Sequence, residues 1–511
     1  MSPESVNPAS GAPVQRVAAA QEILGTLDPV VLELGHLFSD AGYELAIVGG
    51  PVRDALLGRP AHDLDFATSA TPDQSIALLG TWGDAIWDIG KEFGTIGAKR
   101  NATKDAPEFV VEVTTYRSDE YDPASRKPVV AFGTSLIADL SRRDFTVNAM
   151  AITLPDLKFV DPFDGLADLE SQVLRTPIAA EKSFDDDPLR MMRGARFTGQ
   201  LGFSLDEQAK VATTEMAERI TIVSAERVRD ELVKLLMSAD PVRGLGVLVD
   251  TGLADHVLPE LPGMKAATDE HGRHKDVYQH SLIVLQQAID LETGPDGPVP
   301  GPDLLLRLAA ILHDIGKPAT RRFEDNGSVS FHHHELVGAK MTAKRLRALK
   351  FDKETVKTVS RLVELHLRFH GYGEGTWTDS AVRRYVTDAG EQLERLHRLT
   401  RADCTTRNKY KARTLSRAYD SLEERIAILA EQEEIAAIRP DLDGQAIMET
   451  LGIKPGQAVG AAYKFLMELR LDDGPLGPEE AKARLLAWWE QAGPELQGLA
   501  TYVPSGRIKK D

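Results

Sequence analysis

An apolar segment that ends in two glycines, ELAIVGG (44–50), constrains the fold of this chain most strongly. Its pattern predicts a buried strand that turns directly into a short helix, PVRDALLG (51–58). HDLDFAT (62–68) and FVVEVTTYR (109–117) carry β-branched and aromatic residues, and both predict further strands. The first part of the chain is therefore predicted to be an α/β domain.

The hydrophobic pattern changes at about Ser183. DDDPLRMMRGARFTGQLGF (185–203) and SAERVRDELVKLLMSA (224–239) show the 3.6-residue spacing of helices. The proline- and glycine-rich run ETGPDGPVPGPD (292–303) predicts a loop between two helices of one domain. We therefore expect an α/β head followed by an elongated all-α body.

The composition limits the function classes. Acidic residues outnumber basic ones by 78 to 60, which argues against a general nucleic-acid coat or a binder of anionic membranes but allows local basic tracks. The single cysteine excludes an internal disulfide framework and a four-cysteine zinc site, as expected in a reducing compartment. The chain has no apolar run of about 18 residues and no secretory signal. We expect a cytoplasmic protein without a membrane partner.

Two carboxylates in the second predicted strand, Asp63 and Asp65, indicate metal chemistry. Their i, i+2 spacing puts both on one face of a strand, where they repel each other unless a cation lies between them. Mg²⁺ prefers oxygen ligands and is often completed by substrate phosphates. Glu112, in the next predicted strand, would supply a third carboxylate for a two-metal displacement. We therefore predict Asp63, Asp65 and Glu112 as the catalytic group, with Mg²⁺ held by the two aspartates.

Glycines and arginines near these carboxylates suit a bound phosphate chain. Gly49 and Gly50 allow close backbone approach, and their N–H groups can meet a phosphate. Arg53 offers a fixed fork of donors, and Arg143, within SLIADLSRRDFTVNAMAI (135–152), adds a second guanidinium. Each motif alone has an ordinary structural explanation. The two aspartates could form an acidic turn, and the paired arginines could begin a salt-bridged helix. Together, at this spacing, they favour a nucleoside triphosphate site.

Four motifs, in this order, resemble the class II tRNA nucleotidyltransferase family, the bacterial and eukaryotic CCA-adding branch of the DNA polymerase β superfamily. They are GGPVRDALLG with DLD, then EVTTYR, DLSRRDFTVNAMA and DDPLRMMRGARF, and they cover roughly residues 48–236. The resemblance implies template-independent addition of CCA to tRNA 3′ ends from CTP and ATP, with release of pyrophosphate. It also assigns Mg²⁺ binding to Asp63 and Asp65, and nucleotide binding to Gly50, Arg53 and Arg143.

In this family the base is read by an ED-x-x-R motif, which appears here as Asp186-Asp187-Pro-Leu-Arg190. Cytosine and adenine both present an amino donor beside a ring-nitrogen acceptor, which a carboxylate at Asp187 and a guanidinium at Arg190 complement. Uracil and guanine would turn a carbonyl oxygen toward the carboxylate, and such an unpaired contact discriminates strongly. Arg193 and Arg196 resemble further nucleotide contacts of the family. An ordinary helix with surface ion pairs is the alternative.

A second set of histidines and aspartates is spread over predicted helices, and its order resembles the HD phosphohydrolase superfamily, with HDIGK (313–317) as the most recognisable phrase. Mixed His/Asp ligands suit a transition metal or Mg²⁺. The resemblance implies one divalent metal of unknown identity held by His280, His313, Asp314 and Asp403. His334 and His366 are candidates for a second metal or a phosphate contact. Some family members join a transferase head to an HD domain. In some of these proteins the HD domain hydrolyses 2′,3′-cyclic phosphates or phosphate esters.

Two local basic tracks, 340–347 and 395–417, could contact tRNA phosphates despite the acidic net charge. Solvated helix faces are the alternative. In the predicted helix at 224–239, we assign Glu226 and Arg227 only a structural role.

These patterns divide the chain into five predicted segments. They are a disordered lead (1–25), a nucleotidyltransferase head (26–176), a base-selecting helical neck (177–265), an HD domain (266–420) and a C-terminal helical domain (421–511).

Three alternatives to a complete CCA-adding enzyme stay open. A bacterial poly(A) polymerase shares the head motifs, but it usually carries an extra Gly-Arg-Arg-Phe-type phrase where this chain has KEFGTIGAKR (91–100). A partial enzyme could add only C or only A. An HD-domain phosphohydrolase with an RNA-binding head is a rival from another class, although the intact DLD argues against it.

Overall fold

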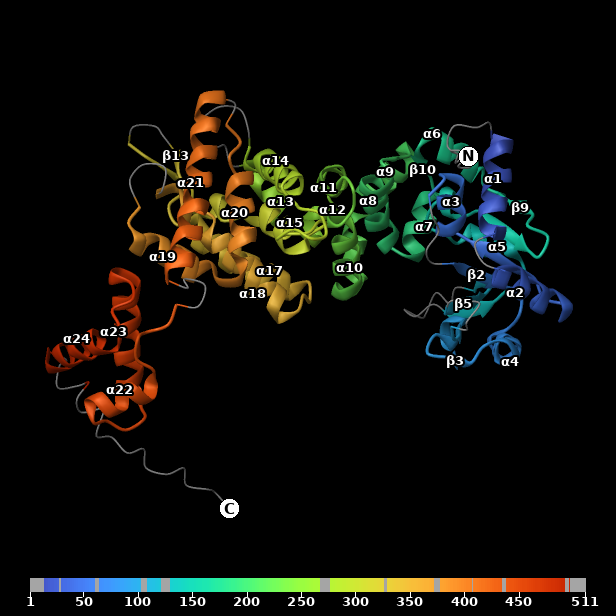
Figure 1. Ribbon diagram of the computed structural model, residues 1–511. Helices are drawn as coiled ribbons and strands as arrows, with labels where there is room; N and C mark the ends of the chain where they lie inside the picture. The colour runs from blue at the N-terminus through green and yellow to red at the C-terminus, as the bar shows by residue number, and fades with distance from the viewer. Residues whose placement is uncertain are drawn as a thin grey trace, which may run out of the picture. The chain divides into compact units, whose positions relative to one another are not determined.

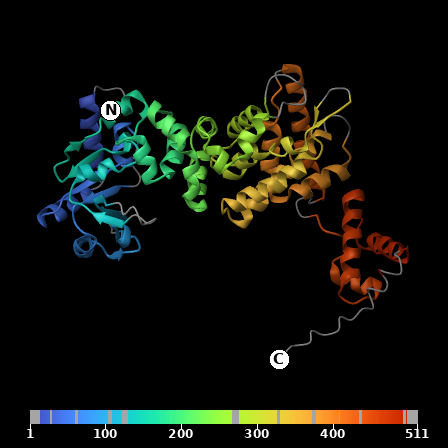
Figure 2. The same ribbon diagram turned by 180° about the vertical axis from the view of Figure 1, so that it is seen from behind.

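The computed structural model describes residues 13–26, 29–59, 64–102, 108–120, 129–266, 276–325, 329–371, 377–406, 408–433, 438–491 and 496. The chain forms two compact units, Met1–Pro259 and Glu260–Asp511. In Figure 1 and, from behind, in Figure 2, the first unit runs from blue to green and the second continues to red. Among the described helices, none is long and apolar enough to cross a membrane.

The first unit is built on a seven-stranded mixed sheet with the order β3-β4-β5-β2-β1-β8-β9. Only β2 and β5 pair in parallel; the other neighbours are antiparallel. The strands are β1 (Leu45–Val48), β2 (Asp65–Thr68), β3 (Ala85–Trp87), β4 (Thr95–Arg100), β5 (Phe109–Thr115), β8 (Ala151–Leu154) and β9 (Phe159–Val160). All three strands predicted from the sequence therefore lie next to one another in the sheet.

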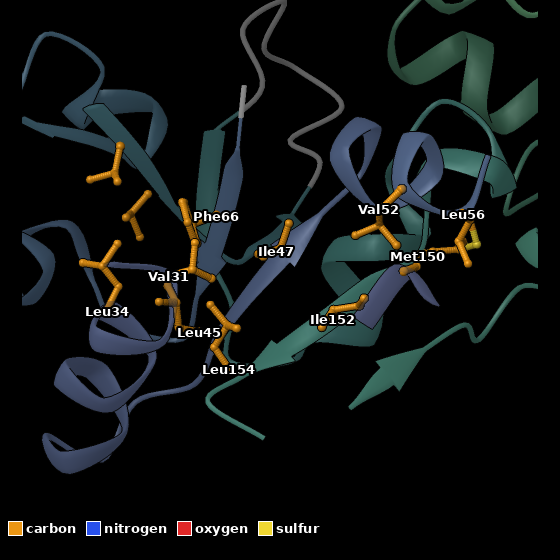
Figure 3. Close-up of a cluster of buried hydrophobic side chains, with 14 of the residues drawn as sticks. Val31, Leu34, Leu45, Ile47, Val52, Leu56, Phe66, Met150, Ile152 and Leu154 are labelled. Carbon is orange, nitrogen blue, oxygen red and sulfur yellow. The ribbon is translucent and has the colours of Figure 1, made fainter. Parts of the chain in front are cut away.

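The two faces of this sheet differ. Alternate residues of a strand point to opposite faces, so Leu45 and Ile47 of β1 enter the large core while Ala46 and Val48 join a small cluster on the other side. Figure 3 shows part of the large core, with side chains from α2, α3 and three strands. They include Val31, Leu34, Leu45, Ile47, Val52, Leu56, Phe66, Met150, Ile152 and Leu154. The cluster on the opposite face includes four alanines, Ala46, Ala67, Ala149 and Ala151.

Helices complete the first unit. Those associated with the sheet are α1 (Pro13–Thr26), α2 (Pro29–Asp40), α3 (Gly50–Leu56), α4 (Pro72–Trp82), α5 (Leu136–Ser141) and α6 (Gly165–Ser171). The neck helices are α7 (Ala180–Asp186), α8 (Leu189–Leu201), α9 (Glu207–Glu215), α10 (Ala225–Leu236), α11 (Pro241–Asp250) and α12 (Leu253–Val257). Two short pairs, β6 (Arg117–Glu120) with β7 (Val129–Phe132) and β10 (Val173–Leu174) with β11 (Ser204–Leu205), lie outside the main sheet.

In its described residues, the second unit has helices and one small hairpin, β12 (Arg322–Phe323) with β13 (Val329–Ser330). Its helices are α13 (Glu260–Gly263), α14 (Val277–Asp290), α15 (Leu304–Leu312), α16 (Lys317–Thr320), α17 (His334–Ala348), α18 (Lys353–Leu365), α19 (Asp379–Ala389), α20 (Leu393–Ala402), α21 (Lys409–Glu433), α22 (Gly444–Leu451), α23 (Gln457–Asp473) and α24 (Pro478–Gln491). The predicted loop at 292–303 joins α14 to α15. The order of an α/β head and a helical body is therefore confirmed.

Two details differ from the sequence predictions. The predicted disordered lead contains α1 from Pro13 onward, with Ala20 fully buried in the large core, so the prediction is wrong for this part. Residues 1–12 lie outside the described residues. Helix α21 continues through residue 420, where we placed a domain boundary, because no helix-breaking residue interrupts it.

Candidate functional site

The predicted catalytic carboxylates Asp65 and Glu112 are register partners on the parallel strands β2 and β5. Neighbouring strands lie about 4.8 Å apart. Phe66 and Val113 point into the large core, so Asp65 and Glu112 point to the opposite face. There both line a cleft of about 1060 Å³. Asp63, the other predicted metal ligand, lies outside the described residues.

The same cleft gathers predicted nucleotide-binding residues from other elements. Arg143 follows α5, Asp187 lies between α7 and α8, and Arg190 is in the first turn of α8, and all three line the cleft. The structure therefore brings these three residues together with Asp65 and Glu112, although up to 125 positions separate them in the sequence.

Arg190 is held in place by the surrounding backbone and one hydroxyl. Its Nη1 donates to Ser183 Oγ at 2.8 Å, and its Nη2 donates to the carbonyl oxygen of Arg142. Burial lowers the pKa of Arg190, although the neighbouring aspartates, led by Asp187, oppose this shift. The guanidinium is therefore fixed at the cleft wall rather than freely mobile.

Asp187 is held from two sides. Its Oδ1 accepts a hydrogen bond from the backbone N–H of Leu189 at 3.2 Å, and its Oδ2 accepts one from Arg227 Nη2 at 3.0 Å. Arg227 also lines the cleft. Our expectation of a purely structural role for Arg227 did not place this side chain beside Asp187.

Gly49 makes room for one of the cleft arginines. Its φ of 77° lies in the left-handed region, and a Cβ here would lie 2.7 Å from Arg143 Nη1. The N–H of Gly49 donates to the carbonyl oxygen of Met150 at 3.2 Å, and Gly50 begins α3. Two glycines therefore allow the strand to turn into a helix directly beside a guanidinium.

Arg53, which we predicted to bind the nucleotide, points inward. It is buried, and its Nη1 donates to Asn148 Oδ1 at 2.7 Å while its Nε donates to Asp54 Oδ1 at 2.9 Å. It is not among the cleft-lining residues. Its contacts join α3 to the segment that precedes β8.

Arg193 and Arg196 also lie behind the cleft lining, in a chain of ion pairs. Arg193 Nη2 lies 2.6 Å from Asp144 Oδ2, and Arg196 Nε lies 2.9 Å from Glu231 Oε2. Burial would raise the pKa of Asp144, but Arg193 and the hydrogen bond from Asn148 outweigh it and lower the pKa. Burial lowers the pKa of Arg196 to about 10 in spite of Glu231.

Sequence reasoning gave no role to Asp144 or Glu231. Asp144 lies within the motif DLSRRDFTVNAMA, but in the sequence it looks like an ordinary acid beside two arginines. Glu231 carries a recognisable signal, because it occupies a position of the apolar stripe of α10, three residues after Val228 and one before Leu232. An acid at such a position needs a buried cationic partner.

In the second unit, the predicted HD ligands gather with both additional histidines. One group consists of His280, His313 and Asp403, and the other of Asp314, His334 and His366. The Oδ2 atom of Asp314 lies 3.2 Å from His313 Nε2, and its Oδ1 atom lies 3.3 Å from His334 Nε2. Asp314 therefore faces both groups, whereas the sequence prediction placed it in one set of four.

The charges of this cluster fit a divalent cation. Burial would lower the pKa of His313, but Asp314 and Asp403 outweigh it and raise the pKa to about 10. Burial and the nearby His313 lower the pKa of His366 to about 3. The buried Nε2 of His366 makes no hydrogen bond to the part of the chain that the structure describes. The two carboxylates favour a positive charge at this position, and a divalent metal would displace the His313 proton and take imidazole nitrogens as ligands.

Comparison with known proteins identifies the family. Three family models match: "Poly A polymerase head domain" over residues 45–175, "Probable RNA and SrmB-binding site of polymerase A" over 202–264 and "HD domain" over 277–408. An A-adding tRNA nucleotidyltransferase from Deinococcus radiodurans is 35% identical over 453 residues, which are 87% of this chain and 96% of that protein. The chain belongs to the class II tRNA nucleotidyltransferase family.

Other members of this family match different shares of the chain. A CCA-adding enzyme from Lactobacillus delbrueckii subsp. bulgaricus is 35% identical over 301 residues, 59% of this chain and 69% of that protein. The crystal structure of the Bacillus stearothermophilus CCA-adding enzyme in complex with CTP has a TM-score of 0.62 at 23% identity and covers 93% of this chain and 98% of its own. This likeness shows a shared fold. The family resemblance inferred from the sequence motifs is confirmed.

Proposed function

We propose that this chain adds CCA to tRNA 3′ ends from CTP and ATP, with release of pyrophosphate. The observation that carries the proposal is the joint position of Asp65, Glu112, Asp187 and Arg190 in one cleft. Carboxylates suited to metal-assisted phosphoryl transfer thus lie beside a donor and an acceptor suited to reading a base. Because tRNA, CTP and ATP meet in the cytoplasm, we place the reaction there.

In the proposed reaction, the 3′-oxygen of the tRNA forms a bond to the α-phosphorus of the nucleotide. The bond from that phosphorus to the pyrophosphate breaks, and the hydroxyl proton is lost to water. Asp63, Asp65 and Glu112 would hold divalent metal, which we infer to be Mg²⁺ from the all-carboxylate donor set. When bound, such ions lower the pKa of the hydroxyl and offset charge on the leaving group. Arg143 would orient the triphosphate, with Gly49 and Gly50 giving it space.

The remaining predicted contacts divide into two kinds. Asp187 would accept a hydrogen bond from the amino group of cytosine or adenine, and Arg190 would donate to the ring nitrogen. Arg53, Arg193 and Arg196 have partners inside the protein, so we propose that they position the cleft walls rather than touch the nucleotide.

A second candidate, addition of A alone, is favoured by one observation. The Deinococcus relative, which matches 87% of this chain, is named as A-adding, whereas the CCA-adding relative described above matches 59%. The cleft residues suit both activities, since cytosine and adenine present the same donor and acceptor pattern.

The HD cluster supports a further activity, hydrolysis of phosphate esters with a divalent metal. Asp314 belongs to one group and faces His313 of the other, so the two adjacent groups could hold two ions. Metal analysis of the purified chain and of a His313→Ala variant, together with hydrolysis of 2′,3′-cyclic AMP, tests this. Bound metal with no hydrolysis would leave only a structural role for the cluster.

An extension ladder tests the main proposal. Three RNAs are offered CTP, ATP or both: a tRNA transcript that lacks CCA, a CC-ended tRNA and an unrelated oligo-A RNA. Addition of C, C and A to the first, lost in Asp65→Ala, would support a CCA-adding enzyme. Extension of only the CC-ended tRNA would make the chain an A-adding enzyme, and long A tails on any RNA would make it a poly(A) polymerase.

A further inference from the structure

The wall of the cleft that faces the sheet includes the start of α10, and one of its arginines contacts the base-reading carboxylate. Ser224 caps this helix by accepting the backbone N–H of Arg227 at 3.4 Å. The cap fixes the backbone from which the Arg227 side chain reaches the Oδ2 atom of Asp187 at 3.0 Å. The Arg227 side chain is 54% exposed and lines the cleft, so it lies on the ligand side of the ion pair.

This contact determines how the carboxylate of Asp187 is oriented. The N–H of Leu189 holds one oxygen at 3.2 Å and Arg227 holds the other, so rotation about the terminal side-chain bond would break one of the two bonds. Each carboxylate oxygen has two lone-pair positions, and each therefore keeps one to accept a further hydrogen bond. Arg190 is fixed independently by Ser183, so the acceptor and the donor of the base-reading pair have separate supports.

We propose that Arg227 is a positioning residue for nucleotide selection, which holds the Asp187 carboxylate in the orientation that accepts an amino group and rejects a carbonyl oxygen. The inference rests on the proposed function, because it takes Asp187 as the group that reads the base. Without Arg227, the carboxylate keeps only its bond to Leu189 and can turn away from the base. A carbonyl group on the incoming base then meets less repulsion, and discrimination falls.

The test compares Arg227→Ala and Arg227→Lys with Arg229→Ala. Arg229 lies on the same helix, pairs with its neighbour Asp230 at 2.8 Å and does not line the cleft, so it is a matched control. We measure kcat/KM for CTP and UTP on tRNA lacking CCA, and for ATP and GTP on CC-ended tRNA. Arg227→Ala should reduce both preference ratios at least about tenfold, and lysine, which keeps the charge but not the fork, should restore them in part. Arg229→Ala should leave both ratios unchanged.

Two further measurements separate this role from a structural one. In an Asp187→Ala background, Arg227→Ala should cause no additional loss of selectivity, since its effect passes through that carboxylate. The ratio of CTP to UTP dissociation constants should also fall in Arg227→Ala, whether or not transfer occurs. If the wild type prefers CTP in binding but extends no tRNA, the proposed function fails while the role of Arg227 can still hold. Unchanged ratios in Arg227→Ala, or an additional loss in the Asp187→Ala background, would overturn the inference.

Discussion

Asp65 and Glu112 face the cleft because their neighbours Phe66 and Val113 point into the large core. The i, i+2 spacing of DLD predicted only that Asp63 and Asp65 share one face of a strand. The partner of Asp65 depended on long-range pairing, because Glu112 comes into register only through the parallel contact of β2 with β5. The inward course of Arg53 could not be predicted either, since its acceptor Asn148 lies 95 positions away.

The Glu112 carboxylate can be tested without harm to the fold. Glu112→Gln keeps the size of this exposed side chain but removes the charge of a proposed metal ligand. We therefore expect the rate of nucleotide transfer to fall at least about a hundredfold. The free energy of unfolding should change by less than about 0.5 kcal/mol. Single-turnover incorporation of CTP measures this. Glu108→Gln, just before β5, is the control, and equal losses in both variants would remove Glu112 from the catalytic group.

Asp144 provides a test that depends on pH. Its pKa is lowered in the folded protein, so its stabilising contribution is present above the unfolded value of 3.8 and is lost as the pH falls through the folded pKa. Asp144→Asn should destabilise the first unit by about 2–3 kcal/mol at pH 7. This loss is smaller than the loss on breaking a fully buried ion pair, because the Arg193 side chain is one-third exposed. Urea unfolding at several pH values should show this difference shrinking below about pH 4. A difference independent of pH would contradict the account.

At the level of elements, periodicity predicted β1, β2, β5, α8 and α10, because each has a strong apolar pattern. It missed α1, which follows a polar start, and it divided α21. The basic track at 395–417 also splits in the structure. Arg395, Arg398 and Arg401 have acidic partners, whereas Arg413 and Arg417 of α21 have no ion pair within the described ranges.

We therefore expect α21, rather than α20, to contact RNA phosphates. Its first turns also present Tyr410, which is 82% exposed and could stack on a base. The double variant Arg413→Ala/Arg417→Ala should weaken tRNA binding and reduce the slope of log K against log salt by about 1.5 to 2. Arg398→Ala, already paired with Glu394, is the matched control and should leave the slope unchanged. Equal slopes in all three proteins would show that α21 does not bind RNA phosphates.

At the level of the whole molecule, the two compact units follow from where long-range contacts form. The predicted head and the predicted neck up to Pro259 lie in one unit, where pairs such as Arg193 with Asp144 join them across 49 positions. Sequence patterns could not show which of the predicted segments pack together, since this depends on contacts between residues far apart in the sequence.

Metal bound at the HD cluster should stabilise the second unit. An ion that binds the folded HD cluster at 100 times its dissociation constant adds about 2.7 kcal/mol to the stability of the unit that contains it. Removal of this metal by a chelator should therefore lower the thermal transition of the second unit. The variant His313→Ala should abolish this response. A response of this transition in that variant would place the metal effect elsewhere.

The selection of C and A in one cleft without a template can be read directly from the sequence of the product ends. A tRNA transcript that lacks CCA is incubated with equal concentrations of CTP, ATP, UTP and GTP, and its 3′ ends are sequenced. We expect ends of CCA that grow no further. Unextended ends, tails of A, or frequent U and G would contradict this expectation.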